Sequence, residues 1–263
     1  MVTAWHDVQP VSDPADRLRV GVSGALGRMG STTCAAVTAD PDLLLVAVID
    51  TGFDPEGSAP VERAGSPRAY AHLEDALHTE DIDVVVDFTV PASVHGNILT
   101  CLSHGVPAVV GTTGLSDADL ADIADRAAET GTPVLVAPNF AMGAVLMMEF
   151  VRQAAKYFPA CEIVELHHDS KLDAPSGTSR LTRARIQQVW RDADVEKEKE
   201  LTIHSVRLPG FVAHQEVIFG SRGETLTIRH DSLTRESFMP GVILAVKRIR
   251  ARQGLIVGLE NVL

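Results

Sequence analysis

Reactive side chains are concentrated in one short segment, Glu165–Thr178, which reads ELHHDSKLDAPSGT. It combines two histidines, a lysine, two aspartates and a Ser-Gly-Thr triplet, a composition that packing alone does not require. Histidine can move a proton near neutral pH, and lysine adds a mobile positive charge. Together these side chains could bind a small polyanion and protonate it during a reaction.

The flanking residues predict how the two histidines are presented. The apolar run that ends at Leu166 indicates a buried strand, in which alternation would send His167 and His168 to opposite faces. Asp169 and Ser170 are turn formers. If the strand stops there, both histidines can face one ligand.

A helix is expected to begin directly after the lysine. Pro175 is followed by Ser176, Gly177 and Thr178 and then by apolar residues at helical spacing, so the hydroxyls would cap the helix. Such a start offers free backbone N–H groups and the positive end of the helix dipole, which together favour an anion. The alternative is a capped helix after a polar turn, with Lys171 in solvent.

The N-terminal part of the chain has the pattern of a dinucleotide-binding unit. A short apolar strand at Leu18–Val22 runs into three glycines of a GxxGxxG pattern, Gly24, Gly27 and Gly30. A helix follows, and then a strand at Leu43–Ile49 that we expect to be buried on both faces and to end at Asp50. The glycines would admit a pyrophosphate at the helix start, and Asp50 would take the ribose hydroxyls. A glycine turn in an unrelated α/β unit is the alternative.

Strands and helices continue to alternate along the first half of the chain. Strands are expected at 82–88, 106–110 and 133–136, with helices at 91–104 and 117–130. Open parallel sheets bind ligands beyond the carboxyl ends of their strands. The segments Gly111–Gly114 (GTTG) and Ala137–Phe140 (APNF) lie there and are candidate nicotinamide and ribose contacts.

The pattern changes in the second half. A long helix is expected at Ala141–Phe158, apolar nearly all round and therefore packed on both sides. Strands at 201–207, 211–219 and 224–230 are joined by hairpin turns, which indicates an antiparallel or mixed second sheet. The predicted fold class is α/β plus α+β. The predicted parts are a flexible tail (1–17), a Rossmann-like dinucleotide-binding domain (18–138 and 235–263) and a substrate-binding and oligomerisation domain (139–234).

Composition limits the function further. Lysine and arginine total 23 against 35 aspartates and glutamates, a net charge of −12, which argues against nucleic acid or an anionic membrane as a partner. The three cysteines, Cys34, Cys101 and Cys161, lack CxxC spacing and indicate a reducing compartment. We see no signal peptide or membrane span and expect a cytoplasmic protein. No Cys, His and Asp cluster has zinc spacing, so we predict no metal site.

The motifs GTTG, APNF and HHxxKxDAPSGT, together with the strand sequences VRLPGFVAHQEVIFG and GETLTIRHDS, resemble the dihydrodipicolinate reductase family of the diaminopimelate and lysine pathway. The resemblance extends from about Arg19 to the C-terminus. It implies a two-domain homotetramer that reduces a cyclic unsaturated dicarboxylate, hydroxy-tetrahydrodipicolinate, to tetrahydrodipicolinate with NADH or NADPH.

The resemblance also implies roles for individual residues. His167 is similar to the proton donor or acceptor of the family, and Lys171 to a second general acid. The residues that would hold the dicarboxylate are His168, Lys171, Ser176, Gly177 and Thr178. The residues that would contact the cofactor are Gly24, Ala25, Leu26, Gly27, Arg28, Met29, Asp50, Gly111, Thr112, Thr113, Ala137, Pro138, Asn139 and Phe140.

The residues around these motifs refine the expectations. Asp173 is either an electrostatic partner of Lys171 or a cap near the helix, and we favour the cap. No arginine follows Asp50 to receive a 2′-phosphate, although Arg28 could serve, so we expect NADH to be used at least as well as NADPH. The chain departs from the family pattern at Ser170 and at Ser179, which bears on the substrate contacts.

Two other classes of function stay open at this point. One is another two-domain NAD(P)-dependent dehydrogenase, such as an aspartate dehydrogenase or a semialdehyde dehydrogenase. The latter needs a nucleophilic cysteine, for which Cys161 in an apolar strand is a poor candidate. The other is a non-catalytic dinucleotide sensor, which should have lost the proton-transfer residues, whereas His167 and Lys171 are both present.

Overall fold

The protein folds as two compact units. The computed structural model describes residues 16–54, 66–195 and 200–263. The first unit comprises the described residues up to Ala137 together with Val242–Leu263, and the second comprises Pro138–Gly241. Residues 1–15 of the predicted flexible tail (1–17) lie outside the described residues.

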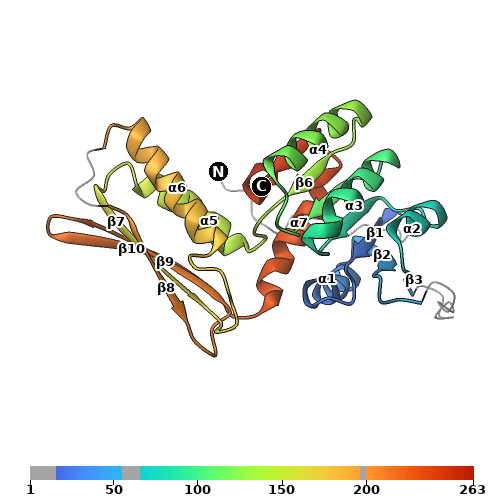
Figure 1. Ribbon diagram of the computed structural model, residues 1–263, viewed down its shortest axis with the longest axis horizontal. Helices are drawn as coiled ribbons and strands as arrows, with labels where there is room; N and C mark the ends of the chain where they lie inside the picture. Colours follow the sequence, from blue (N-terminus) through green and yellow to red (C-terminus); the bar gives the residue numbers. More distant parts are fainter. Residues whose placement is uncertain (1–15, 55–65, 196–199) are drawn as a thin grey trace. The chain divides into compact units, whose positions relative to one another are not determined.

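The first unit is built on a parallel sheet of seven strands in the order β3-β2-β1-β4-β5-β6-β11. Figure 1 labels β1, β2, β3 and β6 of this sheet. The strands are β1 (Leu18–Ser23), β2 (Leu43–Ile49), β3 (Arg68–Tyr70), β4 (Val84–Asp87), β5 (Ala108–Val110), β6 (Val134–Val136) and β11 (Leu255–Val257). This is the strand order of doubly wound dinucleotide-binding folds. The end of the chain returns to this sheet, because β11 pairs in parallel with β6.

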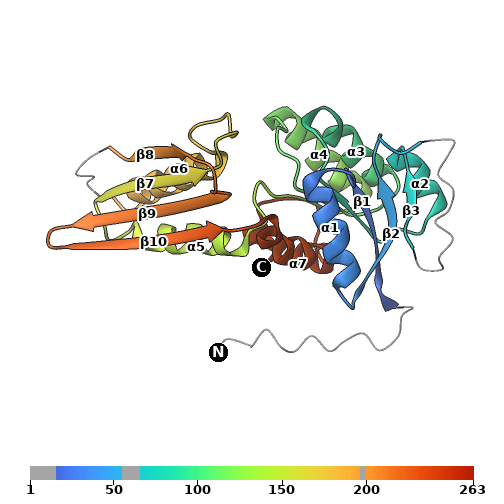
Figure 2. The same cartoon turned by 90° about the horizontal axis from the view of Figure 1, so that it is seen from below.

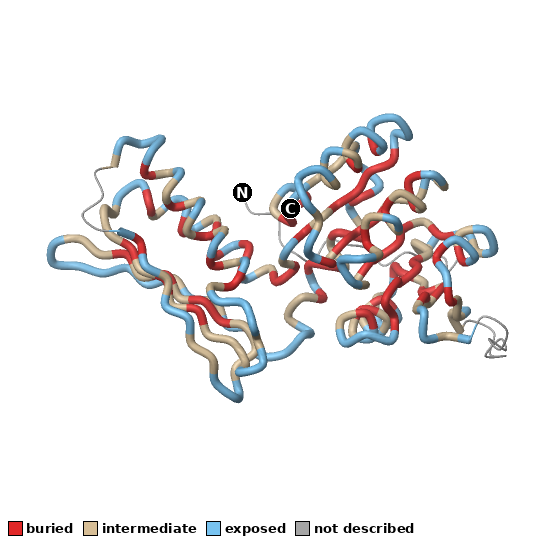
Figure 3. The backbone as a smooth tube through the Cα atoms, in the orientation of Figure 1, coloured by how far each residue is buried: buried red, intermediate tan, exposed pale blue. Residues whose placement is uncertain are grey.

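Helices follow the strands of the first unit. They are α1 (Arg28–Ala39), α2 (Leu73–Thr79), α3 (Pro91–Ser103), α4 (Asp117–Thr130) and, from Val242 onward, α7 (Met239–Ile249), with a final short helix η3 (Leu259–Val262). Side chains of α2, α3 and α4 share one buried cluster with the sheet, and this cluster includes Val85, Ile98 and Ile123. Figure 3 shows buried stretches of the chain, in red, at the centre of this unit. On α7, Lys247 forms ion pairs with Asp40 and Asp42, which fixes this helix to the connection between α1 and β2.

The second unit is a four-stranded mixed sheet with two helices. The strands are β7 (Ala160–His167), β8 (Thr202–Arg207), β9 (Ala213–Ser221) and β10 (Glu224–Ser232), in the order β10-β9-β7-β8. β7 pairs in parallel with β8 and antiparallel with β9, which pairs antiparallel with β10. Helices α5 (Met142–Ala154) and α6 (Gly177–Asp192) pack on this sheet and on each other (Figure 2). A short helix, η2 (Arg235–Phe238), follows β10.

The predicted fold class is confirmed, but the predicted hairpin between the strands at 201–207 and 211–219 is wrong, because β7 lies between β8 and β9 in the sheet. Two expectations of burial are also wrong. β2 is not buried on both faces: full and partial burial alternate along it, because only the short β3 lies between β2 and the sheet edge. α5 is shorter than expected and is not packed on both sides, since Leu146 and Phe150 are exposed in this chain. The structure also contains β3 and α2, which we did not predict.

The glycine turn after β1 generates a prediction about stability. Gly30 lies in the first turn of α1, and a Cβ at this position would overlap the carbonyl oxygen of Gly24. We expect Gly30→Ala to lower the free energy of unfolding by about 1–3 kcal/mol through overpacking. Urea unfolding followed by circular dichroism measures it.

Gly96, in the middle of α3, is the matched control. A Cβ there meets no described atom within 4 Å, so Gly96→Ala should stabilise by up to about 1 kcal/mol through helix propensity. Equal effects of the two substitutions would contradict the packing argument.

Candidate active site

The turn between β1 and α1 is shaped to receive an anionic group. Gly24 has a positive φ of 78°, and a Cβ there would lie 2.5 Å from the carbonyl oxygen of Phe88. α1 then begins at Arg28, after the N-cap residue Gly27, and no described side chain caps it. The first N–H groups of a helix lack intrahelical partners and carry the positive end of the dipole. This start is therefore suited to a pyrophosphate.

Asp50 is fixed beside that turn. One carboxylate oxygen accepts a hydrogen bond from the Leu26 N–H at 3.1 Å, and the other accepts one from the Gly52 N–H at 3.0 Å. Asp50 also lines a cavity of about 480 Å³ in the first unit. The cavity residues are Ser23, Gly24, Gly27, Ile49, Asp50, Thr51, Ala71, His72, Leu73, Phe88, Thr89, Val90, Ser93 and Asn97. A glycine turn, an open helix start and a placed carboxylate beside one cavity fit the adenosine and pyrophosphate of a dinucleotide.

A buried carboxylate, Asp87, organises the neighbouring loops. It ends β4 and accepts hydrogen bonds from the Thr89 hydroxyl at 2.7 Å, the Thr112 hydroxyl at 2.9 Å and the Asn97 amide at 2.7 Å. Thr112 was predicted as a cofactor contact, and its side chain is used here to hold the GTTG loop. We had assigned no role to Asp87, although an acid closing an apolar strand was a usable signal.

The remaining predicted cofactor residues are divided between the units. Gly111 lies against the Phe88 ring, which a Cβ would overlap, and Thr113 is exposed. Ala137 is buried in the first unit, whereas the other residues of APNF belong to the second. There, Asn139 accepts a hydrogen bond from the Ala141 N–H at 2.8 Å and donates one to the Thr178 hydroxyl at 3.5 Å. The APNF segment thus contacts a residue predicted to hold substrate.

The start of α6 is held firmly on the second sheet. Ser176 is the N-cap, and its hydroxyl accepts a hydrogen bond from the Ser179 N–H at 3.2 Å. The Ser179 hydroxyl donates to Gln215 of β9 at 2.8 Å. Gly177 and Thr178 therefore occupy the first two helical positions, whose N–H groups lack intrahelical acceptors. Ser179, one of the departures from the family pattern, has a structural role here.

Glu165 and Arg207 form the buried support of His167. Glu165 stands two positions before His167 on β7, so both side chains lie on one face of the strand. The Glu165 carboxylate is wholly buried, contacts Nδ1 of His167 through one oxygen and accepts a hydrogen bond from Arg207 at 2.8 Å through the other. Because Nδ1 is engaged by a carboxylate, Nε2 is the nitrogen through which His167 would exchange a proton.

Burial and charge set the protonation of this pair. Burial lowers the pKa of His167 below its ordinary value of 6.5, although the Glu165 carboxylate acts in the opposite direction. Burial, the largest single influence, also opposes ionisation of Glu165, but the hydrogen bonds from Arg207 and Ser205 and the nearby positive charge together outweigh it, so the pKa of Glu165 lies below its ordinary value. The pair therefore consists of a carboxylate and a neutral imidazole at neutral pH.

Lys171 and His168 lie in the turn that follows β7. The Lys171 ammonium group donates a hydrogen bond to Asp173 at 2.6 Å and lowers the pKa of that carboxyl group. The expectation that Asp173 is a helix cap was wrong, because Ser176 occupies the cap and Asp173 pairs with the lysine. His168 contacts the Ser170 hydroxyl at 2.8 Å. Ser170, the other departure from the family pattern, therefore touches a residue predicted to bind substrate.

Comparison with known proteins identifies the family. The model of the dihydrodipicolinate reductase N-terminus matches residues 18–140, and that of the C-terminus matches residues 143–263. The chain belongs to the dihydrodipicolinate reductase family. The resemblance stated from the motifs is thereby confirmed.

Curated relatives match almost the full length of this chain. The 4-hydroxy-tetrahydrodipicolinate reductase of Halalkalibacterium halodurans is 44% identical, covering 94% of this chain and 99% of its own. That of Nocardia farcinica is 46% identical, covering 92% and 97%.

Solved structures agree with this membership. The dipicolinate-bound dihydrodipicolinate reductase from Paenisporosarcina sp. TG-14 superposes with a TM-score of 0.79 at 39% identity, covering 94% of this chain and all of that one. A probable dehydrogenase from Thermotoga maritima, with a TM-score of 0.66 at 13% identity over 93% and 92% of the two chains, shares the fold alone. Among the described helices of this family member, none has the length and apolar character to cross a membrane.

The Glu165–His167 contact predicts a titration. In the wild type, histidine-selective NMR should show His167 titrating below 6.5 with its proton on Nδ1. Glu165→Gln removes the charge that favours the imidazolium, so the pKa of His167 should fall further. The pKa of His167 is lower in the folded than in the unfolded protein. Its contribution to the free energy of unfolding is therefore fully present above the pKa of the unfolded state and is lost as the pH falls through the pKa of the folded state.

Glu162→Gln provides the control for this titration. Glu162 lies on the same strand and contacts His204 at 2.8 Å, so the substitution removes a similar charge at a distance from His167. The pKa of His167 should be the same as in the wild type. An unchanged pKa in Glu165→Gln would contradict the assigned coupling.

Proposed function

We propose that the protein reduces 4-hydroxy-tetrahydrodipicolinate to tetrahydrodipicolinate with a reduced nicotinamide dinucleotide, in diaminopimelate and L-lysine biosynthesis. The observation that carries the proposal is the Glu165-supported His167 beside Lys171 and the start of α6. The curated relatives that match almost the entire chain bear the name of this reductase. The alternatives of an aspartate dehydrogenase and of a sensor have no comparable support.

The residues of the first unit would bind the cofactor. The dinucleotide supplies a hydride when it is bound. The N–H groups at the start of α1, from Arg28 and Met29, would hold its pyrophosphate, and Asp50 would accept hydrogen bonds from its ribose hydroxyls. The GTTG loop, which Asp87 fixes through Thr112, would contact the nicotinamide half.

The residues of the second unit would bind the dicarboxylate. The N–H groups of Gly177 and Thr178 at the start of α6 suit one carboxylate, with Ser176 beside them. His168 and the ammonium group of Lys171 would neutralise the other. For this, the ammonium group of Lys171 has to release the Asp173 carboxylate and pair with the substrate carboxylate instead.

Proton transfer is the chemical task of His167 and Lys171. The conversion adds a hydride and a proton and releases the 4-hydroxyl group as water. Hydride addition to a carbon conjugated with C=N leaves an enamine-like anion, which a placed acid must protonate. Two substrate carboxylates near His167 favour its imidazolium form and so raise its pKa when substrate binds. His167 would then donate from Nε2, with Lys171 as the second acid.

We also infer that the chain works as a homotetramer in the cytoplasm. The exposed residues along β10, including Leu226, support an assembly surface on the second unit. The net charge of −12 supports a small-molecule substrate rather than nucleic acid or an anionic membrane as the partner.

The direct test is a coupled assay. The preceding synthase, supplied with pyruvate and aspartate semialdehyde, generates the substrate, and absorbance at the nicotinamide band follows oxidation. Wild type should oxidise the cofactor only when the synthase is present. Lys171→Ala should lower kcat by roughly 100-fold or more, because a general acid contributes about that much, while NADH binding is retained.

Lys156→Ala serves as the matched control, since Lys156 is exposed beyond the end of α5. Its turnover should equal that of the wild type. Absence of oxidation by folded wild type that binds NADH would reject the reductase and favour the sensor.

Cofactor preference gives a second prediction. The Asp50 carboxylate suits ribose hydroxyls and repels a 2′-phosphate, so kcat/KM for NADH should equal or exceed that for NADPH. Asp50→Ala should raise the KM for NADH and shift the ratio toward NADPH by about tenfold. Arg28→Ala should reduce the rate with NADPH but not the rate with NADH. A clear preference of the wild type for NADPH would contradict the role given to Asp50.

A further inference from the structure

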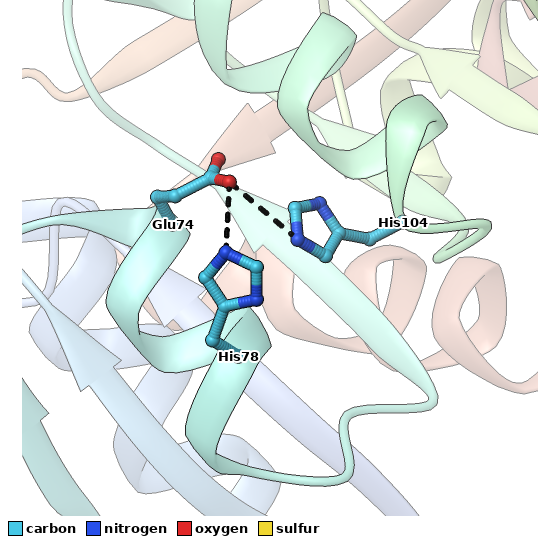
Figure 4. A group of neighbouring side chains, drawn as sticks. All are labelled: Glu74, His78 and His104. Atoms are coloured by element: carbon cyan, nitrogen blue, oxygen red, sulfur yellow. Dashed lines mark ion pairs between the residues drawn. The ribbon is translucent and has the colours of Figure 1, made fainter.

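Three side chains converge on the surface of the first unit, apart from the residues discussed above (Figure 4). Glu74 and His78 lie one turn apart on α2, and His104 is the C-cap residue of α3. One Glu74 oxygen lies 3.2 Å from Nε2 of His78 and 3.6 Å from Nε2 of His104. The potential ligand atoms of all three lie within 4.8 Å of one another.

His104 is oriented by its other ring nitrogen. Nδ1 of His104 lies 3.0 Å from the carbonyl oxygen of Thr100, which can only accept, and 3.2 Å from the Ser103 hydroxyl, which itself donates to that carbonyl oxygen at 2.8 Å. These contacts favour the tautomer with its proton on Nδ1. A neutral His104 therefore turns the lone pair of Nε2 toward the Glu74 carboxylate. Two electron-rich atoms at this separation are stabilised by a cation between them. A backbone carbonyl that fixes the remote nitrogen is also the usual outer support of a metal-binding histidine.

We propose that Glu74, His78 and His104 bind a divalent transition-metal ion of the Zn²⁺ type. Two imidazole nitrogens and one carboxylate oxygen form a typical Zn²⁺ donor set, whereas Ca²⁺ and Mg²⁺ prefer oxygen ligands throughout. Three protein ligands leave a coordination position for water. The site is separate from the reductase chemistry and does not depend on the proposed function.

The bound ion joins α2 to the C-terminal end of α3. α2 starts directly after His72, and both His72 and Leu73 line the cavity assigned to the dinucleotide. Fixing α2 therefore also fixes one wall of that cavity. The sequence predicts no metal site because no Cys, His and Asp cluster has zinc spacing, whereas the third ligand proposed here comes from another helix.

The test uses the full chain, free of any affinity tag and stripped with EDTA, titrated with Zn²⁺ in competition with a chromophoric chelator. The wild type should bind one equivalent of Zn²⁺ with higher affinity than any further equivalents. His104→Gln should weaken that equivalent at least roughly tenfold. His95→Gln is the matched control, because His95 is also on α3 and pairs with Asp122, at 2.9 Å, rather than with Glu74. It should bind as the wild type does.

Thermal unfolding supplies an independent readout. Zn²⁺ should raise the Tm of the wild type and of His95→Gln but not that of His104→Gln, since an ion bound only to the folded state stabilises it. In EDTA the three proteins should unfold alike. If the His104→Gln protein does not fold, the Glu74→Gln protein, which changes an exposed ligand, serves as the ligand variant instead. Equal Zn²⁺ affinity in the wild type and the ligand variant, or absence of a tight equivalent in the wild type, overturns the proposal.

Discussion

The second unit depends on the pairing of one buried group, the ionised Glu165 carboxylate near the end of β7. A buried charge is costly unless it is paired and hydrogen-bonded. Arg207 supplies one partner and the His167 ring the other, so that the histidine is held by the same contact that satisfies the acid. Arg207 also donates to the carbonyl oxygen of Asp173 at 2.7 Å, which extends the support into the lysine turn.

The first unit uses a similar device. Asp87 is a buried carboxylate at the carboxyl end of a central strand, and it collects donors from two loops and a helix. In both units an acid at a strand end fixes segments that the sheet itself does not hold. Loops carry most of the groups proposed to bind ligands, and the carboxylates near the strand ends make the geometry of these loops reproducible. Removing either acid would disturb several of the proposed binding residues together.

Local pattern in the sequence was sufficient for much of this architecture. The glycine turn, Asp50 and the helix start at Ser176 could be predicted because each is encoded within a few neighbouring residues. The role of Glu165 could not, since its partner Arg207 lies 42 residues further along the chain and only the parallel pairing of β7 with β8 brings them together. The partial exposure of α5 depends likewise on which elements cover it, and periodicity cannot specify that.

The hydrogen bond between Lys171 and Asp173 means that the proposed substrate site already contains a carboxylate of its own. Binding of an anionic ligand at Lys171 is then an exchange of one ion pair for another rather than the formation of a new one. The affinity measures the difference between two similar electrostatic energies, both screened by the same salt. Ionic strength should consequently affect this step less than the charge of a dicarboxylate suggests, and shape and hydrogen-bond geometry should decide which anion displaces Asp173.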